Sequence, residues 1–101
     1  MSIKINVTTI QNHAIDFAAY IYHHASIEDR TAIASYGGCI RLGAHPGKVT
    51  RAYFEKAMSH VKYDAYLQFR DALFDDDERE YLDDAIAVWV ARLDAPRLGR
   101  V

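Results

Sequence analysis

Two kinds of hydrophobic periodicity follow one another along this chain of 101 residues. Near the N-terminus Ile3, Ile5 and Val7 alternate with polar residues, which is the two-residue period of a short, half-buried strand. The one other segment that could pair with it is 39–42, which glycines bound on both sides. The sequence therefore leaves open a small two-stranded β-ribbon that uses an N-terminal strand or arm within residues 1–9.

From residue 9 onward the spacing changes to intervals of three and four, as on the buried face of a helix. This spacing predicts helices at 10–25, 27–36, 48–61, 64–74 and 77–94. Ser26 is expected to cap the second helix and Gly37-Gly38 to end it, which makes 37–47 irregular. Pro96 and Gly99 are expected to stop the last helix and leave 95–101 as a flexible tail.

The predicted fold is a mostly α-helical single domain over residues 1–101, with four or five helices around one core. The inward positions of the helices predict a core that contains Phe17, Ile21, Phe54, Phe69, Leu82, Ile86 and Trp89. The stretch AIAVWVA at 85–91 is apolar on every side and must be covered on every side. We expect the other helices to cover it, and contact with a second chain is the alternative.

The composition is that of a globular protein without an internal disulfide. Half of the residues are hydrophobic and about a quarter are charged, which is typical of a globular domain. A single cysteine, Cys39, rules out an internal disulfide, and we expect it to be a buried thiol. The first ten residues lack a secretory signature and no apolar stretch is long enough to span a membrane, so we expect a cytoplasmic protein.

The formal net charge of −2 conceals a strong asymmetry along the chain. Residues 41–62 carry five basic residues and one acid, a net charge of +4. Residues 63–94 carry ten acids and three arginines, a net charge of −7, and seven of these acids fall within 73–84. Each half of this asymmetry suggests a different kind of partner.

Helix capping predicts a role for part of the acidic run. Asp77 at the N-cap and Glu80 three residues later fit a capping box. The acids beyond this need are predicted to form a docking surface for a protein with a basic surface: Asp75, Asp76, Asp83 and Asp84. The run has no glycine for the turn of a calcium loop, and no metal is expected there.

The histidines show no spacing typical of a zinc site. His13, Tyr20 and His24 instead form a ridge beside the buried face of the first helix, and these residue types favour protein interfaces. The ridge is therefore a second candidate surface for contact with a protein.

The basic segment supports a nucleic-acid-binding alternative. Arg41, Lys48, Arg51 and Lys62 could form a stripe that contacts phosphates. The helix predicted to follow, 64–74, would have to enter the major groove, but it carries Asp64 and Asp71 against Arg70 alone. We therefore expect the acidic helices to neutralise the basic one within the fold.

No catalytic motif, phosphate-binding loop or cofactor signature is present. The sequence favours a non-enzymatic, macromolecule-binding protein without a cofactor: a small regulator, inhibitor or adaptor of a protein partner, a role open to proteins encoded by phages and mobile elements. A nucleic-acid-binding protein and a structural homo-oligomer subunit, such as a homodimer, are the alternatives.

Overall fold

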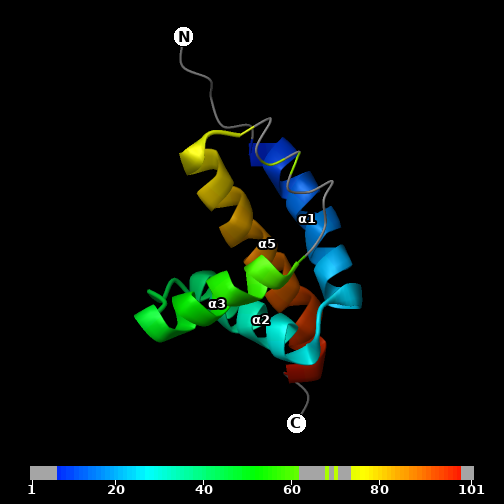
Figure 1. Ribbon diagram of the computed structural model, residues 1–101, viewed down its shortest axis with the longest axis vertical. Helices are drawn as coiled ribbons and strands as arrows, with labels where there is room; N and C mark the ends of the chain where they lie inside the picture. The colour runs from blue at the N-terminus through cyan, green and yellow to red at the C-terminus, as the bar shows by residue number, and fades with distance from the viewer. Residues whose placement is uncertain (1–6, 62–67, 69, 71–73, 99–101) are drawn as a thin grey trace.

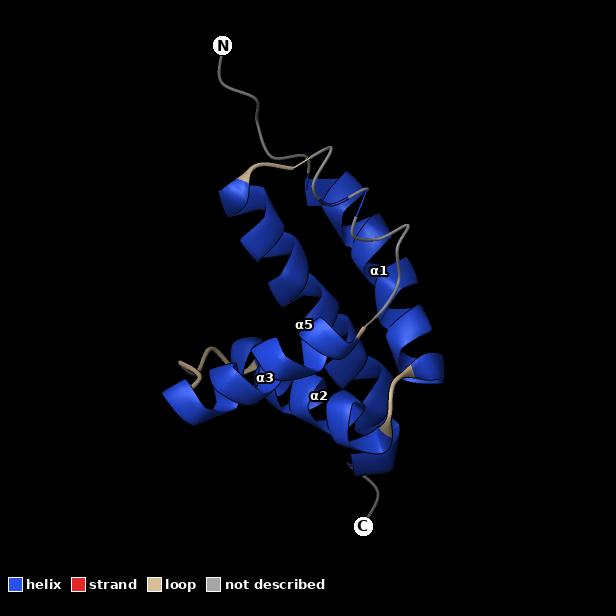
Figure 2. Cartoon of the chain, in the orientation of Figure 1, coloured by secondary structure: helices blue, strands red, loops and turns tan. Residues whose placement is uncertain are grey.

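The computed structural model describes residues 7–61, 68, 70 and 74–98, and this part of the chain is helical (Figures 1 and 2). Its helices are α1 (Val7–His24), α2 (Ile27–Arg41), α3 (Lys48–His60) and α5 (Asp76–Leu98). The fold class predicted from the periodicity is confirmed for these residues. The predicted helix at 64–74 and the arm at 1–6 lie outside the described residues, apart from helical positions 68 and 70.

The longest helix, α5, lies at the centre of the arrangement. It packs against both α1 and α2, and α3 packs on α2. Figure 1 shows α1 and α5 side by side and running in the same direction, while the antiparallel pair α2 and α3 crosses the lower half of α5. The indole Nε1 of Trp89 donates a 2.6 Å hydrogen bond to Oε1 of Gln11 and so joins α5 to α1.

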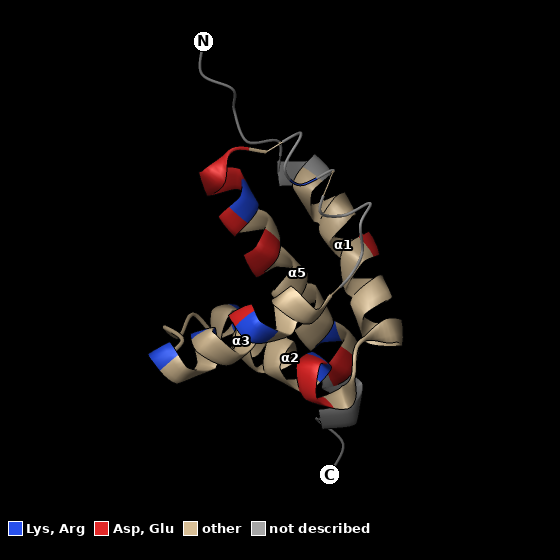
Figure 3. Cartoon of the chain, viewed as in Figure 1, with Lys and Arg blue, Asp and Glu red and all other residues tan. Residues whose placement is uncertain are grey.

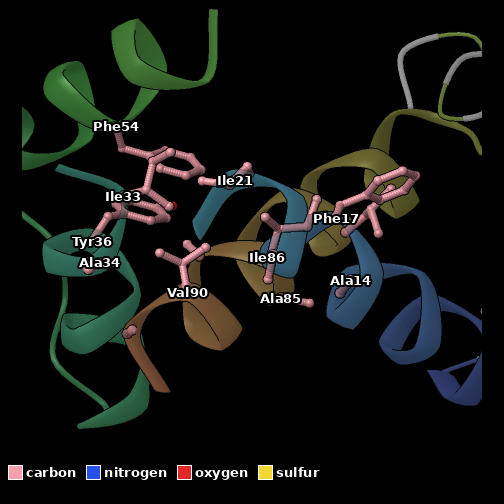
Figure 4. Close-up of a cluster of buried hydrophobic side chains, with 14 of the residues drawn as sticks. Ala14, Phe17, Ile21, Ile33, Ala34, Tyr36, Phe54, Ala85, Ile86 and Val90 are labelled. Atoms are coloured by element: carbon pink, nitrogen blue, oxygen red, sulfur yellow. The ribbon is translucent and has the colours of Figure 1, made fainter. Parts of the chain in front are cut away.

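Aliphatic and aromatic side chains from all four helices meet in one core (Figure 4). Of the predicted core residues, those that are buried are Phe17, Ile21, Phe54, Leu82 and Ile86. Ala87, Val90 and Ala91 are buried too, so the other helices cover the apolar half of α5, as expected. Trp89 is only partly buried at the edge of the core, and Phe69 lies outside the described residues. Leu93 and Tyr53 are exposed.

The prediction that Gly37-Gly38 ends α2 is wrong, because the helix continues to Arg41. Gly37 lies where α2 crosses α5: a Cβ there would be 2.7 Å from the backbone nitrogen of Val88 and closer still to the carbonyl of Ala87. The glycine therefore permits close packing of two backbones. The turn after the helix uses Gly43 instead, at φ +74°. Because 39–41 are helical, they do not form the partner strand of a β-ribbon.

The start of α2 follows local chemistry, whereas the end of α5 does not. Ser26 caps α2 as predicted, because its side chain accepts a 3.1 Å hydrogen bond from the backbone nitrogen of Asp29. The last helix runs through Pro96 to Leu98, so the predicted stop at Pro96 is wrong. Cys39 is a free, half-buried thiol on α2 and not the buried one expected.

The capping box of α5 lies two residues before the predicted one. Asp75 accepts a 2.9 Å hydrogen bond from the backbone nitrogen of Glu78, and Glu78 accepts a 3.1 Å hydrogen bond from the backbone nitrogen of Asp75. This reciprocal pair satisfies two backbone donors at the start of the helix. Asp77 and Glu80, the predicted pair, are exposed positions within the helix. The cap therefore uses an acid that we expected to be free for docking.

Candidate functional site

A polar cleft of about 340 Å³ lies between α3 and the first turns of α5. Figure 3 shows the acidic residues gathered at this end of α5. Helical spacing brings the side chains together, since the contributing positions are three or four residues apart on each helix. The cleft is lined by Arg51, Phe54 and Glu55 from α3, by Arg70, and by Asp76, Arg79, Glu80, Asp83 and Asp84 from α5.

A buried tyrosine anchors the inner wall of this polar cleft. The hydroxyl of Tyr36 donates a 2.9 Å hydrogen bond to Oδ1 of Asp84 and accepts one from Nη1 of Arg51 at 3.3 Å. Its ring stacks on Phe54 with 4.0 Å between centroids. This network joins α2, α3 and α5, so the cleft has a preformed wall.

The network shifts two pKa values. Burial, together with the hydrogen bond and the charge of Asp84, raises the pKa of Tyr36 to about 12. Burial also raises the pKa of Asp84, although the hydrogen bond from Tyr36 and the charge of Arg51 oppose this shift. Tyr36 is therefore a neutral hydrogen-bond donor at neutral pH, and Asp84 is a carboxylate held at an electrostatic cost.

Three arginines neutralise part of the acidic lining. Arg70 binds Asp83 with two hydrogen bonds, of 3.1 Å from Nε and 2.6 Å from Nη2, and both side chains are largely shielded from solvent. This paired geometry is the strongest form of guanidinium–carboxylate contact. Arg79 pairs with Asp76 and also donates a 2.8 Å hydrogen bond to the carbonyl of Phe74. These contacts hold the start of α5 against the segment that precedes it.

Arg51 is shared between the two walls of the polar cleft. Its Nε donates a 3.1 Å hydrogen bond to Glu55, and its Nη2 lies 3.8 Å from Oε1 of Glu80. The expected internal neutralisation of the basic helix thus holds for Arg51. Of the other residues proposed for phosphate contact, Arg41 and Lys48 are exposed, and Lys62 lies outside the described residues.

The cleft keeps an excess of negative charge. Its lining has five carboxylates and three guanidinium groups, a net charge of −2. Arg70 and Arg79 each pair with one acid, and Arg51 is shared between Glu55 and Glu80, so three cations face five acids. The side chain of Glu80 is 62% exposed, so a mobile cation can reach it from solvent. The arrangement can therefore receive a positively charged group.

The sequence-predicted acidic residues divide into two sets. Asp76, Asp83 and Asp84 converge on the cleft, whereas Asp75 belongs to the helix cap. The signal in the sequence for this cleft is the spacing of three acids and one arginine along one helix face, at 76, 79, 80 and 83. Tyr36 gave no such signal, because it is 48 residues from Asp84 in the chain.

The predicted ridge of His13, Tyr20 and His24 lies on α1. The rings of Tyr20 and His24 stack with centroids 4.5 Å apart and line a separate cleft of about 240 Å³ together with Asp29 and His60. His13 stacks instead on Phe17, with centroids 6.4 Å apart. The role of the ridge as a contact surface stays a prediction.

Among the described residues, no group of three or more His, Cys, Asp or Glu side chains has the arrangement of a metal site. None of the described helices is both long and apolar enough to cross a membrane. No family model, curated protein sequence or solved structure matches the chain.

Proposed function

We propose that this protein is a non-enzymatic binding module that docks on a protein partner through the polar cleft. A lysine or arginine side chain of the partner enters between α3 and α5 and approaches Glu80. The observation that carries the proposal is the net charge of −2 in a preformed cleft, in which three arginines face five carboxylates. The module acts as a small regulator, inhibitor or adaptor of a partner with a basic surface.

The fixed inner wall supports binding rather than catalysis. Tyr36 and Asp84 hydrogen-bond to each other, and a tyrosine with a pKa of about 12 is a poor base at neutral pH. A wall that the fold already holds in place costs little ordering when a ligand arrives. Burial is the main cause of the raised pKa of Asp84, and a cation beside Glu80 also offsets the smaller contribution of carboxylate repulsion. Electrostatic complementarity of this kind favours fast and selective association.

Exposed carboxylates at the rim of the cleft attract the same basic partner over a longer distance. The side chain of Asp76 is 93% exposed, and Asp77 is an exposed neighbour outside the cleft. Exposed charges act mainly on the association rate and weaken as salt rises. A nucleic acid is a poorer ligand for this surface because its phosphates would meet the same acids.

A titration of the ¹⁵N-labelled protein with a hexa-arginine peptide at low ionic strength tests the proposal. We expect saturable chemical-shift changes at residues 76–84 and at the side-chain Nε–H of Arg51. Glu80→Gln should weaken binding by about 1.4- to 5-fold, the range for one exposed ion pair. The matched control is Asp77→Asn, which removes an exposed acid from the same helix outside the cleft and should have a smaller effect.

If Glu80→Gln and Asp77→Asn weaken peptide binding equally, the peptide is attracted by the acidic run as a whole and not by the cleft. This result would overturn the cleft proposal. A parallel titration with duplex DNA at about 50 mM salt addresses the nucleic-acid alternative. We expect no measurable binding to DNA. Steeply salt-dependent binding that is lost in a Lys48→Glu, Arg51→Glu double variant would favour that alternative.

A further inference from the structure

A second hollow, on another face of α3, contains more apolar surface than the polar cleft. It is a groove of about 760 Å³ between α2 and α3, and Ala32 and Ala57 are among the residues that line it. Three large hydrophobic side chains in its lining are exposed: Ile27 by 69%, Val49 by 68% and Tyr53 by 60%. Clustered exposure of this kind marks an interaction surface more often than scattered apolar residues do.

The position of the groove explains why α1 and α5 do not cover it. The opposite side of α2 packs on α5, where Gly37 allows the two backbones to approach. Phe54 and Arg51 on α3 line the polar cleft, while Tyr53 and Lys56 line the groove. The two surfaces therefore use different faces of α3. An occupant of the groove would meet α2 and α3 together.

The two walls of the groove carry opposite charges. The α2 wall has Glu28 and Asp29, and the α3 wall has Lys56 and His60. Nδ1 of His60 lies 3.1 Å from both carboxylate oxygens of Asp29, so one contact already crosses the groove at this end. Glu28 and Lys56 are both exposed to solvent. The surface is thus an apolar strip with an acidic side and a basic side.

We propose that a second copy of this chain occupies the groove. Rotation by 180° about an axis along the groove places the acidic α2 wall of one protomer over the basic α3 wall of its partner. With this axis tilted relative to the groove, Glu28 faces Lys56 of the other protomer in two equivalent contacts, and the apolar strips meet along the axis. An isologous dimer requires this kind of self-complementary surface.

The size of the surface sets the expected strength of the dimer. The groove spans positions 27–35 of α2 and 49–60 of α3, with six lining residues from each helix. At 1.5 Å per residue and 8–10 Å between helix axes, the contact is about 18 Å long and about 20 Å wide. An interface of this size falls at the low end for specific complexes. We therefore expect a dimer that dissociates in the micromolar range or above.

Sedimentation equilibrium from about 10 μM to about 1 mM, on the full chain, tests the proposal. We expect the average mass to rise from that of a monomer towards that of a dimer. Tyr53→Asp should abolish the rise, because it places a charge in the apolar strip. Glu28→Lys and Lys56→Glu should each weaken self-association by about fivefold or more, because each puts like charges opposite each other in both equivalent contacts. Asp16→Lys, an exposed site on α1, is the matched control and should leave the mass unchanged.

A mixture of the Glu28→Lys and Lys56→Glu variants separates contact between chains from contact within one chain. In a mixed dimer both equivalent contacts pair opposite charges, so mixing should restore association close to that of the original protein. Circular dichroism melting curves show that each variant is folded. A monomeric mass at about 1 mM, a dimer indifferent to Tyr53→Asp, or a failure of mixing to restore association would each overturn the proposal. None of these outcomes bears on the polar cleft.

Discussion

Gly37→Ala should destabilise the protein strongly, although alanine is the better helix former. The substitution adds one methyl group at the crossing of α2 and α5. That carbon would lie 2.7 Å from the backbone nitrogen of Val88, whereas ordinary contacts are 3.4–4 Å, and the carbonyl of Ala87 is closer still. Backbone atoms cannot rotate away as a side chain can. The two helices must therefore separate by at least about 0.7 Å, the difference between 2.7 and 3.4 Å.

The magnitude follows from the packing that this separation loses. A gap of about 0.5–1 Å removes a quarter to a half of the dispersion attraction between facing atoms, and α2 and α5 form the most extensive helix contact in the described part of the chain. Overpacking of a core costs about 1–3 kcal/mol, and we expect the upper end here. The helical preference of alanine returns about 0.5–1 kcal/mol. The net loss should be about 2 kcal/mol or more.

Gly38→Ala is the matched control, because it adds the same methyl group one position later on the same helix. No atom lies within 4 Å of a Cβ at Gly38, so this variant should gain about 0.5–1 kcal/mol. For a domain of this size, 1 kcal/mol corresponds to about 4–8 °C in Tm. We expect Gly37→Ala to melt about 8–16 °C lower and Gly38→Ala about 2–8 °C higher than the original protein. Equal melting temperatures for the two variants would refute the close crossing of α2 and α5.

Three further predictions concern local features of the fold. Asp75→Ala should lower the free energy of unfolding in urea by about 0.5–2 kcal/mol, because it removes the N-cap of α5; Asp77→Ala should change it by less than about 0.5 kcal/mol. Tyr36 has a folded-state pKa of about 12, above the ordinary 10.0, so its contribution to stability is complete below pH 10 and is lost as the pH rises through about 12. Urea titrations from pH 9 to 12 should show a smaller decline for Tyr36→Phe than for the original protein. Ile86→Ala should lower the free energy of unfolding, measured by thermal denaturation, by about 2–5 kcal/mol, because Ile86 is fully buried. Trp89→Phe should lower it by less, because Trp89 is only partly buried.

Periodicity alone determined the all-helical character of the described part and most of its inward faces. The three- and four-residue spacing placed α1, α3 and α5 within a few residues of their observed bounds. It also identified Phe17, Phe54 and Ile86 as core residues. The cap at Ser26 was predictable because it depends on a hydroxyl and a backbone nitrogen three residues away. These features follow from contacts within one or two turns, so the local sequence contains the information.

Tertiary contacts decided where local preferences gave the wrong answer. In the sequence, Gly37 indicates a helix end. In the fold it lies inside α2 at the contact with α5, and the packing energy gained by the close approach of the two helices exceeds the helical penalty of glycine. The acidic run could be divided into cap, ion pairs and excess charge only after α3, Arg70 and Tyr36 were placed beside it. Tyr36 and Asp84 are 48 residues apart, and no local pattern links them. A charge's role depends on which groups the fold brings within a few ångströms, because electrostatic and hydrogen-bond energies fall off over that distance.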